Sequence, residues 1–252
     1  MESLERKSMC YDMSFFAPVQ QINEVIQIEE WPADDFHPTY HQVAQTWHPF
    51  PVVFKDDNKN KLAYFEWGLI ASYMNTPEKI AEYRSSMANA RSEKIIGDTR
   101  SVWHRIRNQR CLVCTTGFFE HRDIGVKKKL PYFIQVKDKT IFLLTGLYNY
   151  ATNTETGEMT GTFSIITRDG NELLKKIHNS GPNGGRMPLI LTETLAKQWL
   201  ESDLTDEAMS EILSFQFPSD QLEARPVNTI RKRKDDSVSI IQSLPLETVP
   251  AL

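Results

Sequence analysis

Short apolar runs alternate with polar stretches along the middle of the chain, and most of these runs are rich in β-branched or aromatic residues. Runs of this length and composition predict strands. The polar stretch Lys137-Asp138-Lys139 predicts a hairpin turn between two of them. The expected strands cover residues 52–54, 62–70, 111–120, 132–136, 140–148, 162–167 and 189–191.

Helical stretches lie between and after these strands, and each begins next to a residue that favours a helix N-terminus. Proline suits the first helical position, and Asp or Thr side chains suit the N-cap. The expected helices are 78–84 after Pro77, 99–108 after Asp98, a stretch ending near 177 after Asp169, 193–201 after Thr192 and 206–214 after Thr205. Strands mixed with irregularly placed helices favour an α+β fold with a largely antiparallel, strongly curved sheet.

Composition narrows the class of protein. The chain has 252 residues, of which 40% are hydrophobic and 25% charged, as in ordinary globular proteins. No apolar run approaches the ~20 residues that span a bilayer, and no apolar segment follows Met1–Ser8 as in a secretory signal. Three cysteines indicate a reducing compartment, so we expect a cytoplasmic protein. The net charge of −4 means that any nucleic-acid contact is a local basic surface.

The Met9-Cys10 pair carries the most specific chemistry. If Cys10 becomes the first residue of the mature chain, it combines a free α-amine with a thiol. These groups have ordinary pKa values of about 8 and 8.5, so both are partly nucleophilic near neutral pH. The amine forms a Schiff base with an aldehyde, and the thiol then closes a five-membered thiazolidine. The alternative interpretation is an ordinary internal cysteine in a first strand.

The order of short motifs resembles the SOS response-associated peptidase family over nearly the whole chain, from Cys10 to about Val227. Each motif alone is weak, but seven in the expected order are specific. The motifs are Tyr64-Phe-Glu-Trp67-Gly68-Leu-Ile70, Ala88-Asn89-Ala90-Arg91-Ser92-Glu93, Arg110 to Glu120, Pro131-Tyr132-Phe133, Leu144-Thr-Gly146-Leu147-Tyr148, Phe163-Ser-Ile-Ile-Thr167, and Ile177-His178 with Arg186-Met187-Pro188.

The resemblance implies one domain with a barrel-like sheet and peripheral helices, covering residues 10–252. It implies covalent capture of abasic sites in single-stranded DNA by a monomeric protein through a Cys10 thiazolidine, without a metal or organic cofactor. Residues 1–9 would be an N-terminal extension or propeptide, because the mechanism needs a free Cys10 amine. Translation from Met9, or self-cleavage of the Met9–Cys10 bond, would expose it.

Three departures from the family pattern bear on DNA binding. Tyr11-Asp12-Met13 stands where the family has Gly-Arg-Phe, which removes a basic residue near a DNA phosphate. His121 replaces a Trp after the key glutamate. Seven residues, 179–185, lengthen the loop between His178 and Arg186.

The candidate catalytic residues are Cys10, Glu120, His178 and Asn89. Strand alternation puts Glu120 on the same face as Phe118, where desolvation raises the pKa of a carboxyl group and suits it to proton transfer. The alternative for Glu120 is a surface position at a strand end. His178 ends a helix and is a second proton carrier or a simple cap of the helix dipole. Asn89 is expected to bind the sugar or orient the Cys10 amine.

A second set is expected to bind DNA. Arg91 would contact a phosphate, or pair with Glu93 in a polar loop. Arg105 and Arg107 lie in a basic tract, 100–110, that is equally consistent with a solvated amphipathic helix. Arg186 joins this set, as does Trp67 as a stacking surface, although core packing is the commoner position for a tryptophan.

Cys111 and Cys114 do not form a metal or redox motif. Residues three apart in a strand point to opposite faces, and no second Cys or His pair is present at zinc spacing. We expect them to be buried apolar residues, and the tail after Leu222 to be peripheral. Two other functions remain open: a cysteine peptidase acting in trans through Cys10 and His178, and a non-catalytic nucleic-acid-binding module.

Overall fold

A closed barrel of five strands forms the centre of the molecule. The computed structural model describes residues 10–125, 128–153, 156–231, 233, 235–245, 247 and 249–252. In order around the barrel, the strands are β3 (Pro49–Asp56), β6 (Arg110–Thr115), β9 (Phe142–Thr152), β10 (Met159–Asp169) and β4 (Lys59–Trp67). Strand β10 pairs with β4 in parallel, and all other neighbouring strands of the barrel pair antiparallel.

Three short strands extend the barrel on the side where the candidate residues lie. β5 (Asn89–Arg91) pairs with β10 in parallel, and β11 (Arg186–Pro188) pairs with β10 antiparallel. β12 (Ile190–Leu191) pairs with β9. The strands that carry Asn89 and Arg186 therefore flank the same barrel strand.

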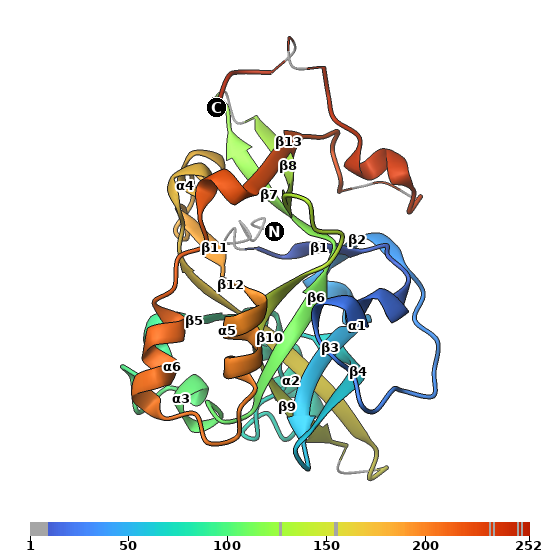
Figure 1. The fold of residues 1–252 in the computed structure, drawn as a ribbon, viewed down its shortest axis with the longest axis vertical. Helices are drawn as coiled ribbons and strands as arrows, with labels where there is room; N and C mark the ends of the chain where they lie inside the picture. Colours follow the sequence, from blue (N-terminus) through green and yellow to red (C-terminus); the bar gives the residue numbers. More distant parts are fainter. Residues whose placement is uncertain are drawn as a thin grey trace.

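A second, five-stranded antiparallel sheet lies across one end of the barrel, above it in Figure 1. Its order is β13 (Leu222–Pro226), β8 (Lys129–Val136), β7 (Gly117–Asp123), β1 (Asp12–Phe15) and β2 (Thr39–Val43). Gly117 begins β7 under the ring of Phe133, where an added Cβ would lie 2.2 Å from the ring. Any larger residue there would push β7 away from β8.

The helices are short and lie around the two sheets, with α4 beside the second sheet and α5 and α6 beside the barrel in Figure 1. They are α1 (Ile22–Val25), α2 (Pro77–Tyr83), α3 (Val102–Arg105), α4 (Glu172–Ile177), α5 (Glu193–Trp199) and α6 (Asp206–Leu213). Single 3₁₀ turns occupy Val19–Gln21, Ala44–Thr46, Arg84–Met87, Ser92–Lys94, Ser219–Gln221 and Val238–Ile241. Among the described residues, no helix is long and apolar enough to cross a membrane.

The predicted α+β fold with a mostly antiparallel, barrel-like sheet is confirmed. Its core is continuous and aromatic: Phe50, Trp67 and Phe163 are fully buried, and the Trp67 and Phe163 rings stack with centroids 6.2 Å apart. The helix starts predicted at Pro77, Thr192 and Thr205 are also confirmed. Two predicted caps are wrong, because Ser101 caps α3 and Asn171 caps α4 in place of Asp98 and Asp169.

Three further expectations are corrected. The stretch 111–120 is divided between β6 and β7 at Thr116, because the chain passes there from the barrel to the second sheet. Lys137–Lys139 forms a turn, but β8 and β9 on either side of it belong to different sheets, so it is not a hairpin. The tail is not peripheral: β13 pairs with β8, and Ile230, Ile240 and Ile241 pack with Phe119 and Phe133 in a second apolar cluster.

Candidate active site

Three of the four predicted catalytic residues line a narrow cavity between the second sheet and the extended edge of the barrel. Cys10 directly precedes Tyr11 and β1, Glu120 lies in β7, and His178 follows α4. Segments separated by more than 160 residues thus contribute to one cavity. Its lining residues are Cys10, Glu120, Thr167, His178, Arg186 and Met187.

Strand register and one hydrogen bond position Cys10. β1 pairs with β7 so that Asp12 faces Phe119, which brings Cys10 beside the next part of β7, where Glu120 lies. From the barrel side, Asn89 Nδ2 donates to the Cys10 carbonyl oxygen at 3.1 Å. Asn89 is itself buried, and its Oδ1 has no hydrogen-bond partner among the described residues. The amide oxygen therefore remains an acceptor beside Cys10.

Glu120 is held as a carboxylic acid by its surroundings. It is 2% exposed, and burial raises its pKa well above the ordinary value, with the charge of Asp12 adding to the rise. Its Oε1 has no hydrogen-bond partner in the described structure, and its Oε2 lies 3.8 Å from His178 Nδ1. A protonated carboxyl group at this position can donate a proton near neutral pH.

The hydrogen bonds around His178 define its tautomer. Its Nδ1 lies 3.0 Å from the Arg186 carbonyl oxygen, which only accepts hydrogen bonds. Nδ1 therefore carries the proton in this arrangement, and a neutral imidazole then has its lone pair on Nε2. The backbone N–H of His178 donates to Leu174 at 2.7 Å, so the end of α4 fixes the ring position.

The thiol of Cys10 is a weak acid in this environment. Burial raises its pKa well above the ordinary value, and the charge of Asp12 raises it further. The resting site therefore favours the thiol over the thiolate. Attack by this sulfur requires a neighbouring group to take its proton.

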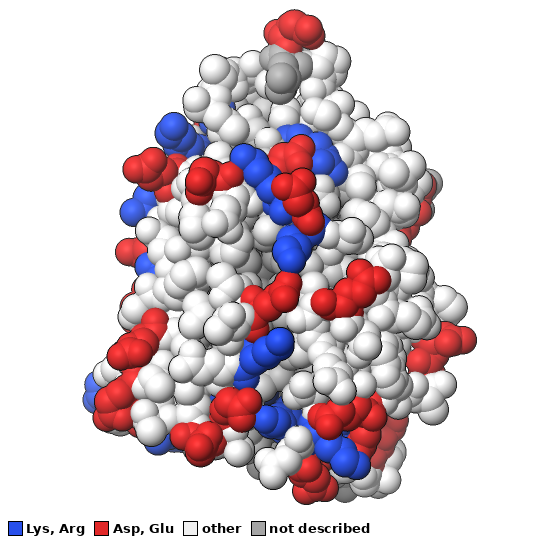
Figure 2. Space-filling model, in the orientation of Figure 1, with Lys and Arg blue, Asp and Glu red and all other residues white. Residues whose placement is uncertain are grey.

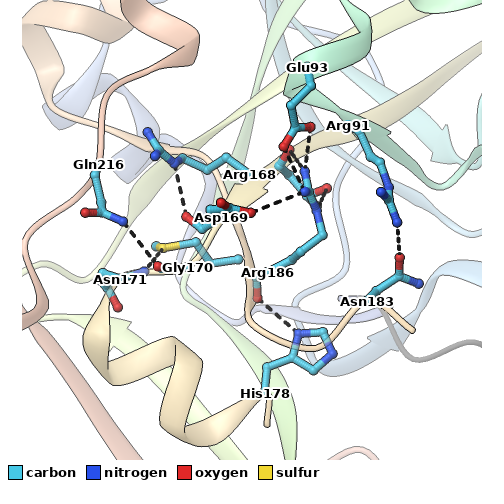
Figure 3. A network of polar contacts seen from close by, with 12 residues as sticks. Arg91, Glu93, Arg168, Asp169, Gly170, Asn171, His178, Asn183, Arg186 and Gln216 are labelled. Carbon is cyan, nitrogen blue, oxygen red and sulfur yellow. Dashed lines mark hydrogen bonds and ion pairs between the residues drawn. The ribbon is translucent and has the colours of Figure 1, made fainter. Parts of the chain in front are cut away.

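A polar network on the barrel side supports this cavity (Figure 3). Arg186 points away from His178 and forms two parallel hydrogen bonds to Glu93, at 2.9 and 3.0 Å. Arg91 follows the same edge, and its Nη2 donates to Asn183 Oδ1 at 2.6 Å. Asn183 belongs to the lengthened loop, so this loop lies against the arginine that was expected to bind phosphate.

Comparison with known proteins identifies the family of the chain. A family model described as SOS response associated peptidase (SRAP) matches residues 9–231.

The chain belongs to the SRAP family.

Relatives within and beyond bacteria carry one functional name. The abasic site processing protein YoqW of Bacillus subtilis is 31% identical, covering 93% of this chain and 100% of that protein. The abasic site processing protein HMCES of Xenopus tropicalis is 24% identical, covering 80% of this chain and 66% of that protein. A crystal structure of a Bacteroides thetaiotaomicron protein superposes with a TM-score of 0.83 at 30% identity, covering 94% of this chain and 100% of that one.

This SRAP protein has a buried ion cluster beside Cys10 that the sequence did not predict. The two oxygens of Asp12 are bound separately, by His41 Nε2 at 2.8 Å and by Arg231 Nη2 at 2.6 Å. Burial alone would raise the pKa of Asp12, but these partners outweigh it and the pKa is lowered. A charged residue inside the apolar run Tyr11-Asp12-Met13-Ser14-Phe15 was the available sequence signal.

The expected DNA contacts divide into accessible and inaccessible side chains. The prediction for Trp67 is wrong, because its indole is fully buried and donates to the Ala88 carbonyl at 2.9 Å. Arg107 is held by Asp206 at 2.8 Å, and Arg186 is buried against Glu93. Arg91 and Arg105 are exposed.

Outside the cavity, surface charge and the other two cysteines do not indicate a second functional site among the described residues. Figure 2 shows basic and acidic side chains interspersed on the face in view, without one continuous basic surface. Cys111 and Cys114 are buried, unpaired thiols in β6, as predicted. Within the described ranges, no group of three or more His, Cys, Asp or Glu side chains is placed to hold a metal ion.

Proposed function

We propose that this SRAP protein captures abasic sites in single-stranded DNA, as a monomer, through a covalent thiazolidine formed by an N-terminal Cys10. The observation that carries the proposal is the convergence of Cys10, Glu120 and His178 on one cavity. The names of the relatives, abasic site processing proteins, support the same substrate.

The chemistry needs only an aldehyde as co-reactant. The Cys10 amine adds to the aldehyde of the ring-opened abasic sugar, and loss of one water gives the imine. The thiol then adds across the C=N bond: sulfur bonds to carbon, and its proton is transferred to nitrogen. Because the thiol is held next to the imine, ring closure has the advantage of an intramolecular reaction.

Glu120 and His178 carry the protons in this scheme. Glu120, held as a carboxylic acid, protonates the departing hydroxyl as water leaves. The lone pair of the His178 imidazole accepts the thiol proton as sulfur attacks, since burial disfavours a thiolate in the resting site. Asn89 aligns Cys10 through its carbonyl and offers Oδ1 to the amine or the sugar.

The Cys10 amine must be free for this reaction. An amide nitrogen has no basic lone pair and cannot form an imine. Translation from Met9, followed by removal of the initiating methionine, would give a free amine. Self-cleavage would do the same if the Cys10 sulfur attacks the Met9 carbonyl, releases the amine as a thioester forms, and water then hydrolyses the thioester.

The exposed arginines Arg91 and Arg105 are proposed to bind DNA phosphates. Asn183 occupies one terminal nitrogen of Arg91, so its guanidinium retains donors for a phosphate. A cysteine peptidase acting in trans would use the same Cys10 thiol and His178, and it would be blocked by alkylation of the thiol but not by capping of the amine.

The test uses protein beginning at Cys10 and single-stranded DNA with one abasic site. We expect an adduct stable to heat and denaturant, and none with intact DNA or with a reduced abasic site. Cys10→Ala should give no adduct. Cys10→Ser keeps the amine, so borohydride should still trap its Schiff base on the DNA. Reversible binding without any shifted band, from protein proven to begin at Cys10, would leave only the non-catalytic binding module.

The mature N-terminus gives an independent test. N-terminal sequencing of the native protein should read Cys-Tyr-Asp-Met-Ser. Capping of the amine should block the adduct as completely as alkylation of the thiol. If protein that begins at Met1 still cross-links abasic DNA, the aminothiol mechanism is wrong.

A further inference from the structure

The C-terminal segment is fixed against the sheet that carries Cys10. After β13, Val227, Ile230, Ile240 and Ile241 pack on Phe119 and Phe133. The carboxylate of Asp236 accepts hydrogen bonds from the backbone N–H groups of Tyr40 and His41 in β2, at 2.9 and 3.1 Å. The apolar contacts and these hydrogen bonds anchor the segment at both ends of its basic stretch, which begins at Arg231.

Arg231 is thereby held against β1, close in the chain to the reactive cysteine. Its Nη2 lies 2.6 Å from Asp12 Oδ2, and Asp12 is two residues from Cys10. Its charge also acts on Tyr11, which follows Cys10, and on Glu120 and His121 of β7. Arg231 is therefore a cation of the site, although it lies 221 residues after Cys10 in the chain.

Asp12 does not use all the hydrogen-bonding capacity of Arg231. A guanidinium has five N–H donors, and the described structure records one hydrogen bond for this one. Its Nε is buried without a partner, and 37% of the side chain is exposed. An anion arriving at this surface would therefore meet an arginine that is already oriented and still has free donors.

Arg233, two residues later, is arranged differently. Its Nε and Nη2 form two hydrogen bonds to Asp235, at 3.1 and 2.7 Å, and Nη2 also donates to Ser239. Its acidic partner is exposed and lies on the same segment. The two arginines share a segment and a charge, but of the two only Arg231 pairs with Asp12 of β1, so Arg233 is the matched control.

We propose that Arg231, oriented by Asp12, binds a phosphate of the DNA strand whose abasic sugar lies at Cys10. The proposal rests on the proposed function, because it takes the DNA strand as the occupant of the site. It makes the C-terminal segment part of the binding surface and gives Asp12 a positioning role.

The experiment measures reversible binding to single-stranded DNA with a reduced abasic site, which has no aldehyde and cannot be cross-linked. Affinity is followed across salt concentrations for wild type, Arg231→Gln and Arg233→Gln, all beginning at Cys10. The slope of log affinity against log salt is negative, and loss of one phosphate contact on single-stranded DNA makes it shallower by about 0.7. We expect this change for Arg231→Gln, with about tenfold weaker binding at low salt, and no change for Arg233→Gln.

A second variant guards against misfolding. Arg231→Gln leaves Asp12 buried with His41 alone, so the double variant Asp12→Asn, Arg231→Gln removes the unpaired charge as well. It should melt close to wild type and show the same reduced slope. A lower melting temperature with an unchanged salt slope in both variants overturns the proposal and leaves Arg231 as a structural partner of Asp12.

The aldehyde-containing DNA separates the two proposals. If wild type cross-links it while Arg231→Gln keeps the full salt slope, the role of Arg231 is overturned and the proposed function stands. If Arg231→Gln makes the salt slope shallower by about 0.7 but wild type never cross-links, Arg231 binds phosphate and the covalent chemistry fails.

Discussion

Two buried carboxyl groups on neighbouring strands of one sheet have pKa values that are shifted in opposite directions. Asp12 in β1 and Glu120 in β7 are each 2% exposed, so burial alone would raise both pKa values. Asp12 has His41 and Arg231 as partners, and its pKa is lowered. Glu120 Oε1 has no hydrogen-bond partner among the described residues, and burial raises the pKa of Glu120. The partners decide the direction of the shift: it favours the anion for Asp12 and a protonated group able to donate a proton for Glu120.

The largest expected effect concerns Glu120 as a proton donor and is measured on the rate of adduct formation. Glu120→Gln, in protein beginning at Cys10, should slow adduct formation about 100-fold or more, because the amide cannot donate a proton to the departing water. Asp12→Asn, equally buried, is the comparison: at saturating DNA, where phosphate binding does not limit the rate, it should change the rate by less than about tenfold. Single-turnover gel assays measure both. Equal rates for wild type and the Glu120 variant would show that the proton carrier is misassigned.

The next effect concerns the partners that stabilise the Asp12 carboxylate and is measured on the free energy of unfolding. His41→Ala should lower the free energy of unfolding by about 3 kcal/mol, because Asp12 then keeps its charge with one partner fewer. Urea denaturation near neutral pH measures it. The exposed His37→Ala is the matched control and should stay within about 0.5 kcal/mol of wild type. A loss below about 1 kcal/mol for His41→Ala would mean that the ion cluster is not the source of Asp12's charge.

The sign of the pH dependence sharpens the comparison for Glu120. Its folded-state pKa lies above the unfolded value of about 4.3, so its contribution to stability is complete below that pH. The contribution is lost as the pH rises through the folded-state pKa. Glu120→Gln should therefore become more stable than wild type by about 1 kcal/mol per pH unit above pH 5. Melting curves from pH 5 to 9 that stay parallel would contradict this.

The smallest effect has the opposite sign. The folded-state pKa of Asp12 lies below its unfolded value of about 3.9, so its contribution is present above that pH and is lost as the pH falls. Asp12→Asn should flatten acid unfolding below about pH 4, with a difference from wild type of about 1 kcal/mol. Circular dichroism during acid titration tests this, and superimposable curves would remove Asp12 from the account of acid stability.

The sequence predicted what local chemistry determines. Motif order pointed to Cys10, Glu120 and His178, and the fold brings them to one cavity. Thr192 and Thr205 were recognisable as caps, because a cap is decided within four residues. Trp67 was misjudged, because an aromatic residue in a strand has the same local pattern whether it faces the core or a ligand. The turn at Asp138 was local, but whether it joins paired strands depends on the whole sheet order.

The contacts of Asp12 with His41 and Arg231 could not be predicted from the sequence, because they too depend on the order of strands in the whole sheet. His41 is 29 residues away and Arg231 is 219 residues away. No spacing rule connects side chains at these separations, and a basic tail is typical of a solvated segment. Only the pairing of β13 with β8 and of β1 with β7 brings the two ends of the chain together.

The same long-range contact sets an order of events during synthesis. A ribosome adds 5–20 residues per second, so roughly 10–45 s separate the appearance of Asp12 from that of Arg231. Throughout that interval the nascent chain carries Cys10 without the arginine that belongs beside it. The segment around Cys10 is made early, and the ion pair between Asp12 and Arg231 can form only when translation is nearly complete.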